Sequence, residues 1–223
     1  MKEFLDREQA RALSYHLLAQ CYGFPTEALK EEKIADHLLQ LLPLIEESTE
    51  ESIEKMKKYL EEVKDLQELQ LDFSKLFIGP QNLLAPPYGS LYLENKGQIM
   101  GESTYDVVRL FNEAGVKKLK DVKEPQDHIR IELEFMYCLI DETIIACKEG
   151  SWEKAEKYIR LQLEFLNHHL GRWIKPFTDN VYNHAETVFY KNLALATVNY
   201  IKQDYLEDSL AMAKEFENIK GQK

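Results

Sequence analysis

The chain has 223 residues, enough for a substantial buried core without disulfides or structural metals. Hydrophobic residues make up 44% and charged residues 30%, with only 9 Gly and 7 Pro, which excludes disordered, collagen-like and low-complexity classes. Asp and Glu outnumber Lys and Arg by 39 to 28, and the formal net charge is -11. This balance disfavours nucleic acid and anionic lipid as partners and favours a cationic peptide.

The three cysteines, Cys21, Cys138 and Cys147, form no C-x-x-C pair, and an odd number cannot complete a disulfide framework. We therefore expect a reducing compartment. The segment from Met1 to Glu8 is charged throughout and lacks the apolar core of an export signal. No later apolar run approaches the roughly 18 residues of a spanning helix. These features predict a cytoplasmic protein with no export signal of its own and no integral membrane segment.

Apolar residues recur at helical spacing along the whole chain, which predicts an all-α fold, a helical bundle forming one domain over residues 1–223. The first helix is expected to end at Gly23. A second helix is expected to begin at Thr26 and to end at Pro43. Residues 46–68 are mostly Glu and Lys with a narrow apolar stripe, which predicts a solvated helix.

The middle of the chain is less regular. Residues 73–92 are apolar, aromatic and rich in proline, so they cannot form one continuous helix. Ser103, with Asp106 three residues later, resembles a capping box for a helix that ends at Gly115. A basic linker over residues 117–123 follows.

The most apolar helix is predicted over residues 124–148, and its two apolar faces place it in the middle of the bundle. Its beginning gathers Glu124, Pro125, Asp127 and His128. Proline at a helix entry and aspartate in the first turn are typical of a helix N-terminus. A helix start needs only one such cap, however, and two carboxylates with an imidazole beside an apolar groove also suit the binding of a guanidinium.

The last third of the chain is predicted to be helical throughout. Ser151 is expected to cap a helix that runs to Gly171, and later helices are expected over about 180–202 and 206–220.

Evidence for an enzyme is weak. Carboxylate-bridged di-metal sites need Glu-x-x-His pairs, and no histidine of this chain has a Glu three residues before it. The pairs Glu164 with His168 and Glu124 with His128 stand four residues apart, which suits either part of a metal site or a simple surface pair. Nucleophile elbows and phosphate-binding glycine loops are missing. We therefore expect no catalytic residues, no metal and no cofactor, with a metal-binding helical enzyme as the less favoured alternative.

Two motifs resemble those of the TorD/DmsD/NarJ family of redox-enzyme maturation chaperones. The first is Glu124-Pro125-Gln126-Asp127-His128-Ile129, which leads into Leu133-Glu134-Phe135-Met136. The second is Phe73-x-x-Leu76-Phe77 with Gly79-Pro80, followed by Ala85-Pro86-Pro87-Tyr88. The first motif has one residue, Gln126, between its Pro and its Asp. A tail from His169 through Trp173 to Leu193 also fits, so the resemblance spans nearly the whole chain.

The resemblance implies an all-α chaperone that binds the twin-arginine leader, or an equivalent N-terminal segment, of a molybdenum enzyme's catalytic subunit. Such a chaperone assists insertion of the client's molybdopterin cofactor and proofreads its export. A NarJ-like assembly chaperone for a nitrate reductase that is not exported is the alternative, and a purely structural helical adaptor is a third hypothesis. The implied state is a monomer or a domain-swapped homodimer with a hinge near 117–123. No phosphate loop supports guanine-nucleotide binding.

Carried over residue by residue, the resemblance implies that both motifs contact the peptide, through Phe73, Leu76, Phe77, Glu124, Pro125, Asp127 and His128. Tyr88 is added to this set. An aromatic-x-x-Leu-Phe run equally suits core packing, so its three apolar side chains are expected either in the groove or in the core. If the acids serve only the peptide, replacing Asp127 and His128 by Ala lowers affinity with little loss of stability.

Overall fold

The computed structural model describes residues 1–41, 47–79, 83–94, 97–118 and 122–221. Within these ranges the chain is helical with no strand, and the one extended pairing is an isolated antiparallel bridge between Tyr88 and His128. The prediction of an all-α fold is confirmed. The helices, in chain order, are α1 (Lys2–Cys21), α2 (Ala28–Glu31), α3 (Ile34–Gln40), α4 (Glu47–Glu62), α5 (Gln67–Phe73), α6 (Ser90–Leu93), α7 (Glu102–Ala114), α8 (Ile129–Lys148), α9 (Trp152–Phe165), α10 (Gly171–His184), α11 (Val188–Gln203) and α12 (Ser209–Lys220).

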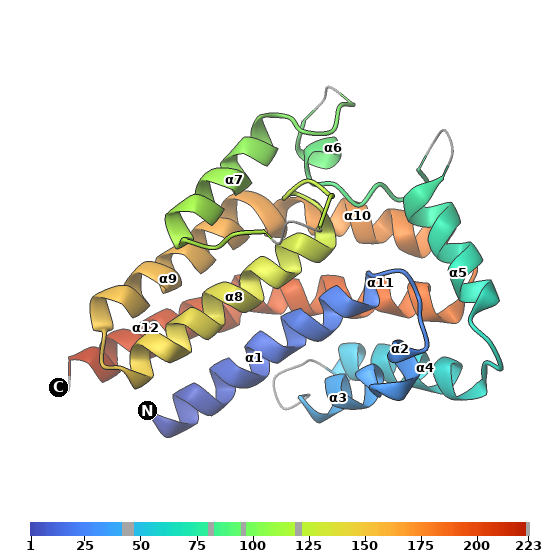
Figure 1. The fold of residues 1–223 in the computed structure, drawn as a ribbon. Coiled ribbons are helices and arrows are strands. Elements are labelled where there is room, and N and C mark those ends of the chain that lie inside the picture. The colour runs from blue at the N-terminus through green and yellow to red at the C-terminus, as the bar shows by residue number, and fades with distance from the viewer. Residues whose placement is uncertain (42–46, 80–82, 95–96, 119–121, 222–223) are drawn as a thin grey trace.

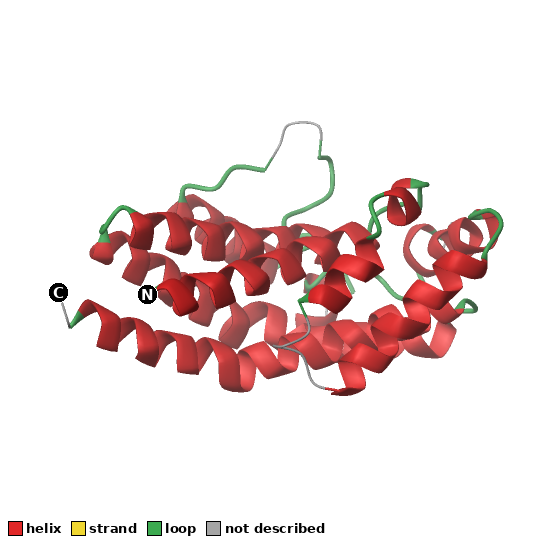
Figure 2. Ribbon diagram, turned by 90° about the horizontal axis from the view of Figure 1, so that it is seen from below, coloured by secondary structure: helices red, strands yellow, loops and turns green. Residues whose placement is uncertain are grey.

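Helix α8 lies in the centre of the bundle, packed between α1 and α9 (Figure 1). Its side chains Leu133, Met136, Leu139 and Ile140 are fully buried. A helix that is apolar on more than one face must be covered on more than one side, which is why the sequence pattern predicted its position. Both chain termini lie at the same end of the bundle (Figures 1 and 2).

Two long helical runs are each interrupted by one π-helical turn. Leu166–Leu170 joins α9 to α10, and Asp204–Asp208 joins α11 to α12. Gly171 has ordinary helical angles, so the prediction that a helix ends there is wrong. The helix predicted from about residue 180 begins instead at Val188, after a break in which Thr187 is the N-cap. Apolar spacing did not locate either boundary, because a π turn adds only one residue to a turn and the break before Val188 is short.

The first half of the chain departs from the predicted boundaries in two places. The second helix is split into α2 and α3 because Lys33 adopts a left-handed φ of 48°. Pro43, its expected end, lies outside the described residues. The solvated helix predicted over 46–68 ends at Glu62, and a new helix begins at Gln67.

The middle segment is irregular, as predicted: a π-helical turn at Ser74–Ile78 and the short α6 replace any continuous helix. Ser103 is not an N-cap. Gly101 takes that position, and the backbone N–H and hydroxyl of Ser103 both donate to Glu94. The predicted end at Gly115 is confirmed, since its φ of 74° is the left-handed angle that favours glycine.

The most apolar helix begins at Ile129, later than predicted. Residues 124–127 lie outside it, and His128 is the N-cap of α8, its Nδ1 accepting from the backbone N–H of Arg130 at 3.1 Å. Ser151 takes the N-cap position of α9, as predicted, with no side-chain capping bond. No helix in the described part of the chain is long and apolar enough to cross a membrane.

Candidate functional site

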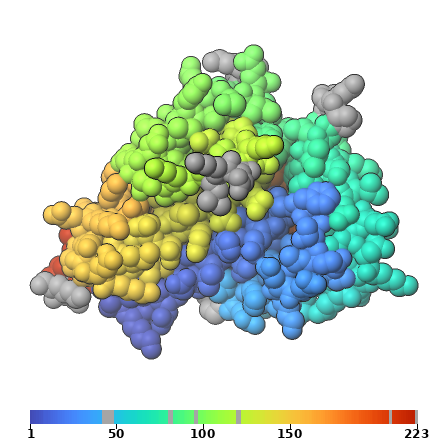
Figure 3. Space-filling view, viewed as in Figure 1, coloured from blue at the N-terminus to red at the C-terminus, as the bar shows by residue number. Residues whose placement is uncertain are grey.

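A groove of about 540 Å³ opens beside the first turns of α8. Its walls come from the end of α1, the π turn that follows α5, the segment before α6 and the end of α7. Figure 3 shows the blue N-terminal segments, the teal α5 region and the yellow-green beginning of α8 meeting around a hollow on this face. Segments far apart in the sequence therefore build one site.

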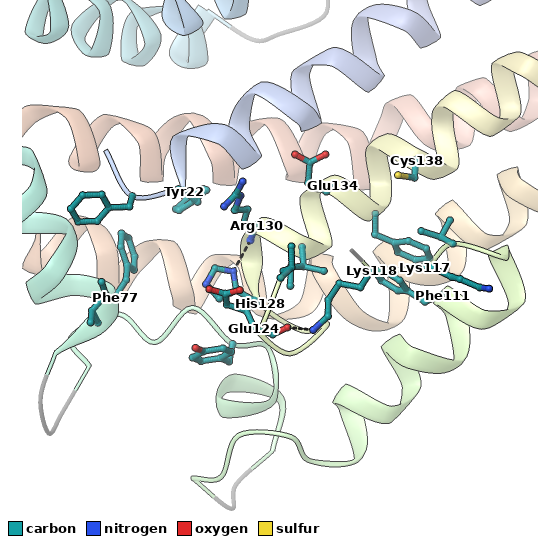
Figure 4. A pocket seen from close by; sticks show the side chains of 18 of the residues that line it. Tyr22, Phe77, Phe111, Lys117, Lys118, Glu124, His128, Arg130, Glu134 and Cys138 are labelled. Atoms are coloured by element: carbon teal, nitrogen blue, oxygen red, sulfur yellow. Dashed lines mark hydrogen bonds between the residues drawn. The ribbon is translucent and has the colours of Figure 1, made fainter. Parts of the chain in front are cut away.

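One end of the groove is aromatic. Phe73 packs edge-on against Phe77 with ring centroids 5.1 Å apart, and Phe24 packs edge-on against Phe73 at 5.5 Å. Tyr22 lies beside Phe77 at this end (Figure 4). Phe24 and Ile78 are 52% and 59% exposed, which is unusual for large apolar side chains lining a groove. This end therefore presents apolar surface to a partner without any rearrangement of the fold.

The other end is apolar as well. Phe111 stacks on Phe135 at 4.0 Å, and Val116, Val122 and Cys138 complete the lining. Burial raises the pKa of the Cys138 thiol to about 11, so the thiol stays protonated and unreactive at neutral pH. Figure 4 shows Phe111 and Cys138 at the opposite end of the groove from Tyr22 and Phe77.

The lining of the groove also carries charged side chains. Glu124 and Glu134 bring carboxylates to the lining, and Lys117, Lys118 and Arg130 bring cations. Glu124 is exposed, and its carboxylate has no hydrogen bond or ion pair with any residue the structure describes. Glu134 is partly engaged, since it accepts from the ring of His16 at 3.0 Å, a contact that raises the pKa of this histidine.

His128 contributes a neutral imidazole to the middle of the groove. Burial lowers its pKa to about 4, so the ring carries no charge at neutral pH. Because Nδ1 accepts from the N–H of Arg130, the neutral ring carries its proton on Nε2 (Figure 4). Tyr88 packs edge-on against this ring at 5.3 Å. The pair offers hydrogen-bonding groups on a mostly apolar wall.

Asp127 lies behind that wall and outside the groove. It is fully buried, its Oδ2 accepts from the backbone N–H of Ser90 at 3.0 Å, and its backbone oxygen accepts from Gly89 at 2.8 Å. The N–H of Ile129 donates to the backbone oxygen of Pro87 at 2.8 Å. The expectation that Asp127 caps its own helix is therefore wrong, because it holds the beginning of α6.

Beneath this contact lies a second buried carboxylate, Glu132. Its Oε1 lies 2.6 Å from Nε2 of His169, and its Oε2 accepts from Nε1 of Trp173 at 2.9 Å. Burial raises the pKa of Glu132 to about 7, against the opposing effect of both partners. Burial alone lowers the pKa of His169, but the Glu132 carboxylate outweighs it and raises the value. Sequence reasoning missed Glu132, although a glutamate within the most apolar helix was a signal.

The structure brings five of the eight predicted residues into the groove lining: Phe73, Phe77, Tyr88, Glu124 and His128. Leu76, Pro125 and Asp127 do not line it. Leu76 is fully buried core, whereas Phe73 and Phe77 are 8% and 7% exposed and serve core and groove together. Direct contact with a peptide therefore fails for Leu76 and Asp127 in this structure. Among the lining residues that sequence reasoning missed are Tyr22, Phe24, Ile78 and Glu134.

The burial of Asp127 also corrects the expected behaviour of the double variant. Removing its carboxylate deprives a buried backbone N–H of its acceptor, which costs about 1–2 kcal/mol of stability. Replacing Asp127 and His128 together therefore destabilises the fold and does not isolate binding.

A metal site finds no support in the described residues, which hold no group of three or more His, Cys, Asp or Glu placed for a metal ion. Glu164 instead pairs with Arg109 at 2.7 Å and with Arg160 at 3.4 Å. Glu124 and His128 face the groove. All three cysteines are free thiols.

Comparison with known proteins places this architecture in a family. The family model of the nitrate reductase delta subunit matches residues 42–179, well over half of the chain. That range contains α8, the aromatic π turn and the buried cluster around Glu132.

Curated relatives carry the name chaperone protein TorD. The protein from Photobacterium profundum is 36% identical over 123 residues, 55% of this chain and 56% of that protein. The protein from Aliivibrio fischeri is 29% identical over 137 residues, 61% of this chain and 62% of that protein. The chain thus spans about three fifths of the length of these relatives.

A solved structure from Archaeoglobus fulgidus, described as a redox enzyme maturation protein, has the same fold. It matches with a TM-score of 0.50 and 21% identity, covering 86% of this chain and 91% of that one. The fold, the family model and the named relatives agree. The chain belongs to the nitrate reductase delta subunit family, the TorD/DmsD/NarJ family that its two motifs resemble.

Proposed function

We propose that this chain is a cytoplasmic chaperone, and no enzyme, that binds the twin-arginine leader or N-terminal segment of a molybdenum enzyme's catalytic subunit in the groove beside α8. Binding there would assist cofactor insertion and delay export until the client is complete. The curated relatives are named chaperones, which supports the class of function.

The observation that carries the proposal is an unpartnered carboxylate beside exposed aromatic surface. Glu124 has no ion-pair partner among the described residues, and Phe24 and Ile78 lie exposed at the aromatic end of the same groove. A twin-arginine leader offers the complement, two adjacent guanidiniums followed by an apolar run. Carboxylates bind guanidiniums through charge-assisted, paired hydrogen bonds.

The groove sets the expected strength of binding. Three or four apolar anchors contribute about 1.5–3 kcal/mol each, and association costs on the order of 4–15 kcal/mol. At the favourable end of both ranges, about 12 kcal/mol gained against about 4 kcal/mol lost leaves about 8 kcal/mol, which corresponds to roughly micromolar affinity. The cations Lys117, Lys118 and Arg130 in the same lining oppose a basic peptide, so the charged contacts contribute mainly to specificity and to the rate of association. Moderate affinity suits a chaperone that must release its client.

Calorimetric titration of the full chain tests the proposal. One peptide carries two adjacent arginines and the following apolar run of a molybdoenzyme leader, and a second has both arginines replaced by glutamine. We expect micromolar binding of the first and at least tenfold weaker binding of the second. Equal affinities, or no binding of either peptide, would overturn the proposal.

A matched pair of variants locates the binding site. Ile78→Ser removes a groove side chain that is 59% exposed, and Leu210→Ser removes a side chain that is 48% exposed and outside the groove. Neither substitution opens a core cavity, so both variants should fold. Only Ile78→Ser should weaken binding of the peptide that carries the two arginines.

A second candidate function is assembly of a nitrate reductase that is not exported. The description of the matching family model favours it. In that case the client segment lacks paired arginines, and its apolar residues alone occupy the groove. An N-terminal nitrate reductase peptide without arginine pairs would then bind at least as tightly as the twin-arginine leader, and Ile78→Ser would weaken it equally.

We further propose that the chain acts as one helical domain, either as a monomer or as a homodimer that exchanges helices about residues 117–123. Part of that linker lies outside the described residues. Light scattering after size-exclusion chromatography distinguishes the two states.

A further inference from the structure

The buried cluster of Glu132, His169 and Trp173 is not part of the groove lining, yet it lies directly under one groove wall. A carboxylate without solvent exposure is costly to bury, even when hydrogen-bonded. Glu132 lies in the first turn of α8, where an apolar side chain would pack against the core without this cost, so the packing of the bundle does not explain it. The contacts above the cluster provide an explanation.

Gly89 rests on the two donors that bind Glu132. A Cβ on Gly89 would lie 3.0 Å from Nε2 of His169 and 3.0 Å from Nε1 of Trp173. Gly89 has ordinary helical angles, so the site requires glycine for space and not for conformation. Glu132 is hydrogen-bonded to both of the groups that the backbone of Gly89 approaches, so it helps to fix the surface on which residue 89 lies.

Other contacts keep the same two rings in place. The imidazole of His169 stacks on Phe165 with centroids 5.5 Å apart, and the indole of Trp173 stacks on Tyr92 of α6 at 5.6 Å. His169 lies in the π turn between α9 and α10, where one extra residue per turn changes the direction of side chains relative to a regular helix. Glu132 thus connects α8 and the π turn to the segment around Gly89.

That segment carries the groove wall. Gly89 follows Tyr88, which is bridged to His128 and packs against its ring, and both side chains line the groove. The backbone N–H of Gly89 also donates to the backbone oxygen of Asp127. The position of Tyr88 and His128 therefore depends on what lies beneath residue 89.

We propose that Glu132, acting through His169 and Trp173, is a positioning residue that fixes Tyr88 and His128 where the groove can bind its peptide. This inference rests on the proposed function of the groove. It predicts that substitution of Glu132, which does not contact the peptide, changes the affinity for the peptide. It also predicts that peptide binding changes the fluorescence emission of Trp173.

The test uses one chemical change in two buried networks. Glu132→Gln converts a buried carboxylate to an amide under the groove, and Asp204→Asn makes the same change in the network of Arg11, which does not line the groove. Peptide affinity is measured for both variants at a temperature at which circular dichroism shows each to be folded. We expect at least a fivefold loss for Glu132→Gln and less than a twofold change for Asp204→Asn.

The fluorescence of Trp173 supplies a second readout, because its response to the peptide does not depend on the overall stability of the fold. The chain has two tryptophans, so Trp152→Phe leaves Trp173 as its single indole. In this background the peptide should shift the emission of Trp173, and adding Glu132→Gln should abolish the shift even at saturating peptide.

A second variant covers the case in which Glu132→Gln does not fold. Gly89→Ala disturbs the same contact from above, and it should lower affinity at least fivefold. Failure of the parent chain to bind would overturn the proposed function itself. If the parent chain binds the peptide, and Glu132→Gln and Gly89→Ala bind it with the same affinity, only the positioning role is overturned.

Discussion

The buried network around Arg11 and the buried cluster around Glu132 use the same chemistry in two regions of the molecule. Arg11 donates to Asp204 at 2.7 Å, to Glu8 at 2.8 Å and to Gln162 at 2.8 Å, and all of these residues are at most 4% exposed. Glu132, with His169 and Trp173, is equally buried. Both contain ionisable side chains whose hydrogen bonds the core must satisfy internally.

The two regions differ in what they connect. The Arg11 network joins α1 to α9 and to the π turn before α12, so it holds helices of the bundle together. The Glu132 cluster joins α8 and the π turn before α10 to a groove wall. A buried charge can therefore serve the stability of a bundle or the shape of a site, and only its neighbours show which.

Breaking the Arg11 network should have the largest effect on stability. Asp204→Ala removes the carboxylate that binds two nitrogens of Arg11, leaving a buried guanidinium only partly paired. We expect the free energy of unfolding in urea to fall by about 3–5 kcal/mol, with peptide affinity unchanged in the folded fraction. Lost affinity at constant fold would contradict the separation of the two regions.

Glu132 should make the stability of the fold depend on pH near neutrality. Its pKa rises from an ordinary 4.5 to about 7 in the fold, so the folded state binds the proton more tightly. The stability that this proton contributes is complete below about pH 4.5 and is lost as the pH rises through 7. His128, whose pKa falls from 6.5 to about 4, acts in the opposite direction between those values.

Comparing the parent with Glu132→Gln separates the pH dependence due to Glu132 from that due to His128. Between pH 4.5 and 7.5 the unfolding free energy of the parent should fall by roughly 2–3 kcal/mol relative to the variant. Parallel curves for the two proteins, measured by urea denaturation at each pH, would show that Glu132 is ionised throughout.

The smallest effect is expected at the surface of the groove. Glu124→Gln removes an exposed carboxylate, which should leave the free energy of unfolding unchanged and weaken binding of a twin-arginine peptide by about 0.2–1 kcal/mol, which is roughly a 1.4- to fivefold change in affinity. Because the contact is solvent-exposed, the difference between parent and variant should vanish as salt rises from 0.05 to about 0.5 M. A loss that persists at high salt would argue against a simple exposed ion pair.

Much of the fold was predictable because helices follow local rules. Apolar spacing showed that α8 is central, and glycine at residue 115 marked the end of α7. The errors fall where a distant contact replaced a local one. Ser103 had the pattern of a cap but binds Glu94, and Asp127 had the position of a cap for α8 but holds Ser90 of α6.

The candidate site was predictable in part for the same reason. Motif order pointed to Phe77, Tyr88 and His128, which do line the groove. Phe24 and Glu134 were missed because each looks ordinary beside its sequence neighbours, and only packing brings them to one surface.

By itself the sequence determined the helical class, the acidic charge, the central position of the most apolar helix and the resemblance to a chaperone family, since composition and periodicity express local preferences. Only the tertiary structure decided which carboxylates are exposed and which are buried in internal hydrogen bonds. Glu124 and Asp127 stand three residues apart, yet one is exposed and the other is fully buried against α6. The physical reason is that the solvation and partners of a carboxylate depend on segments distant in sequence, which no local pattern records.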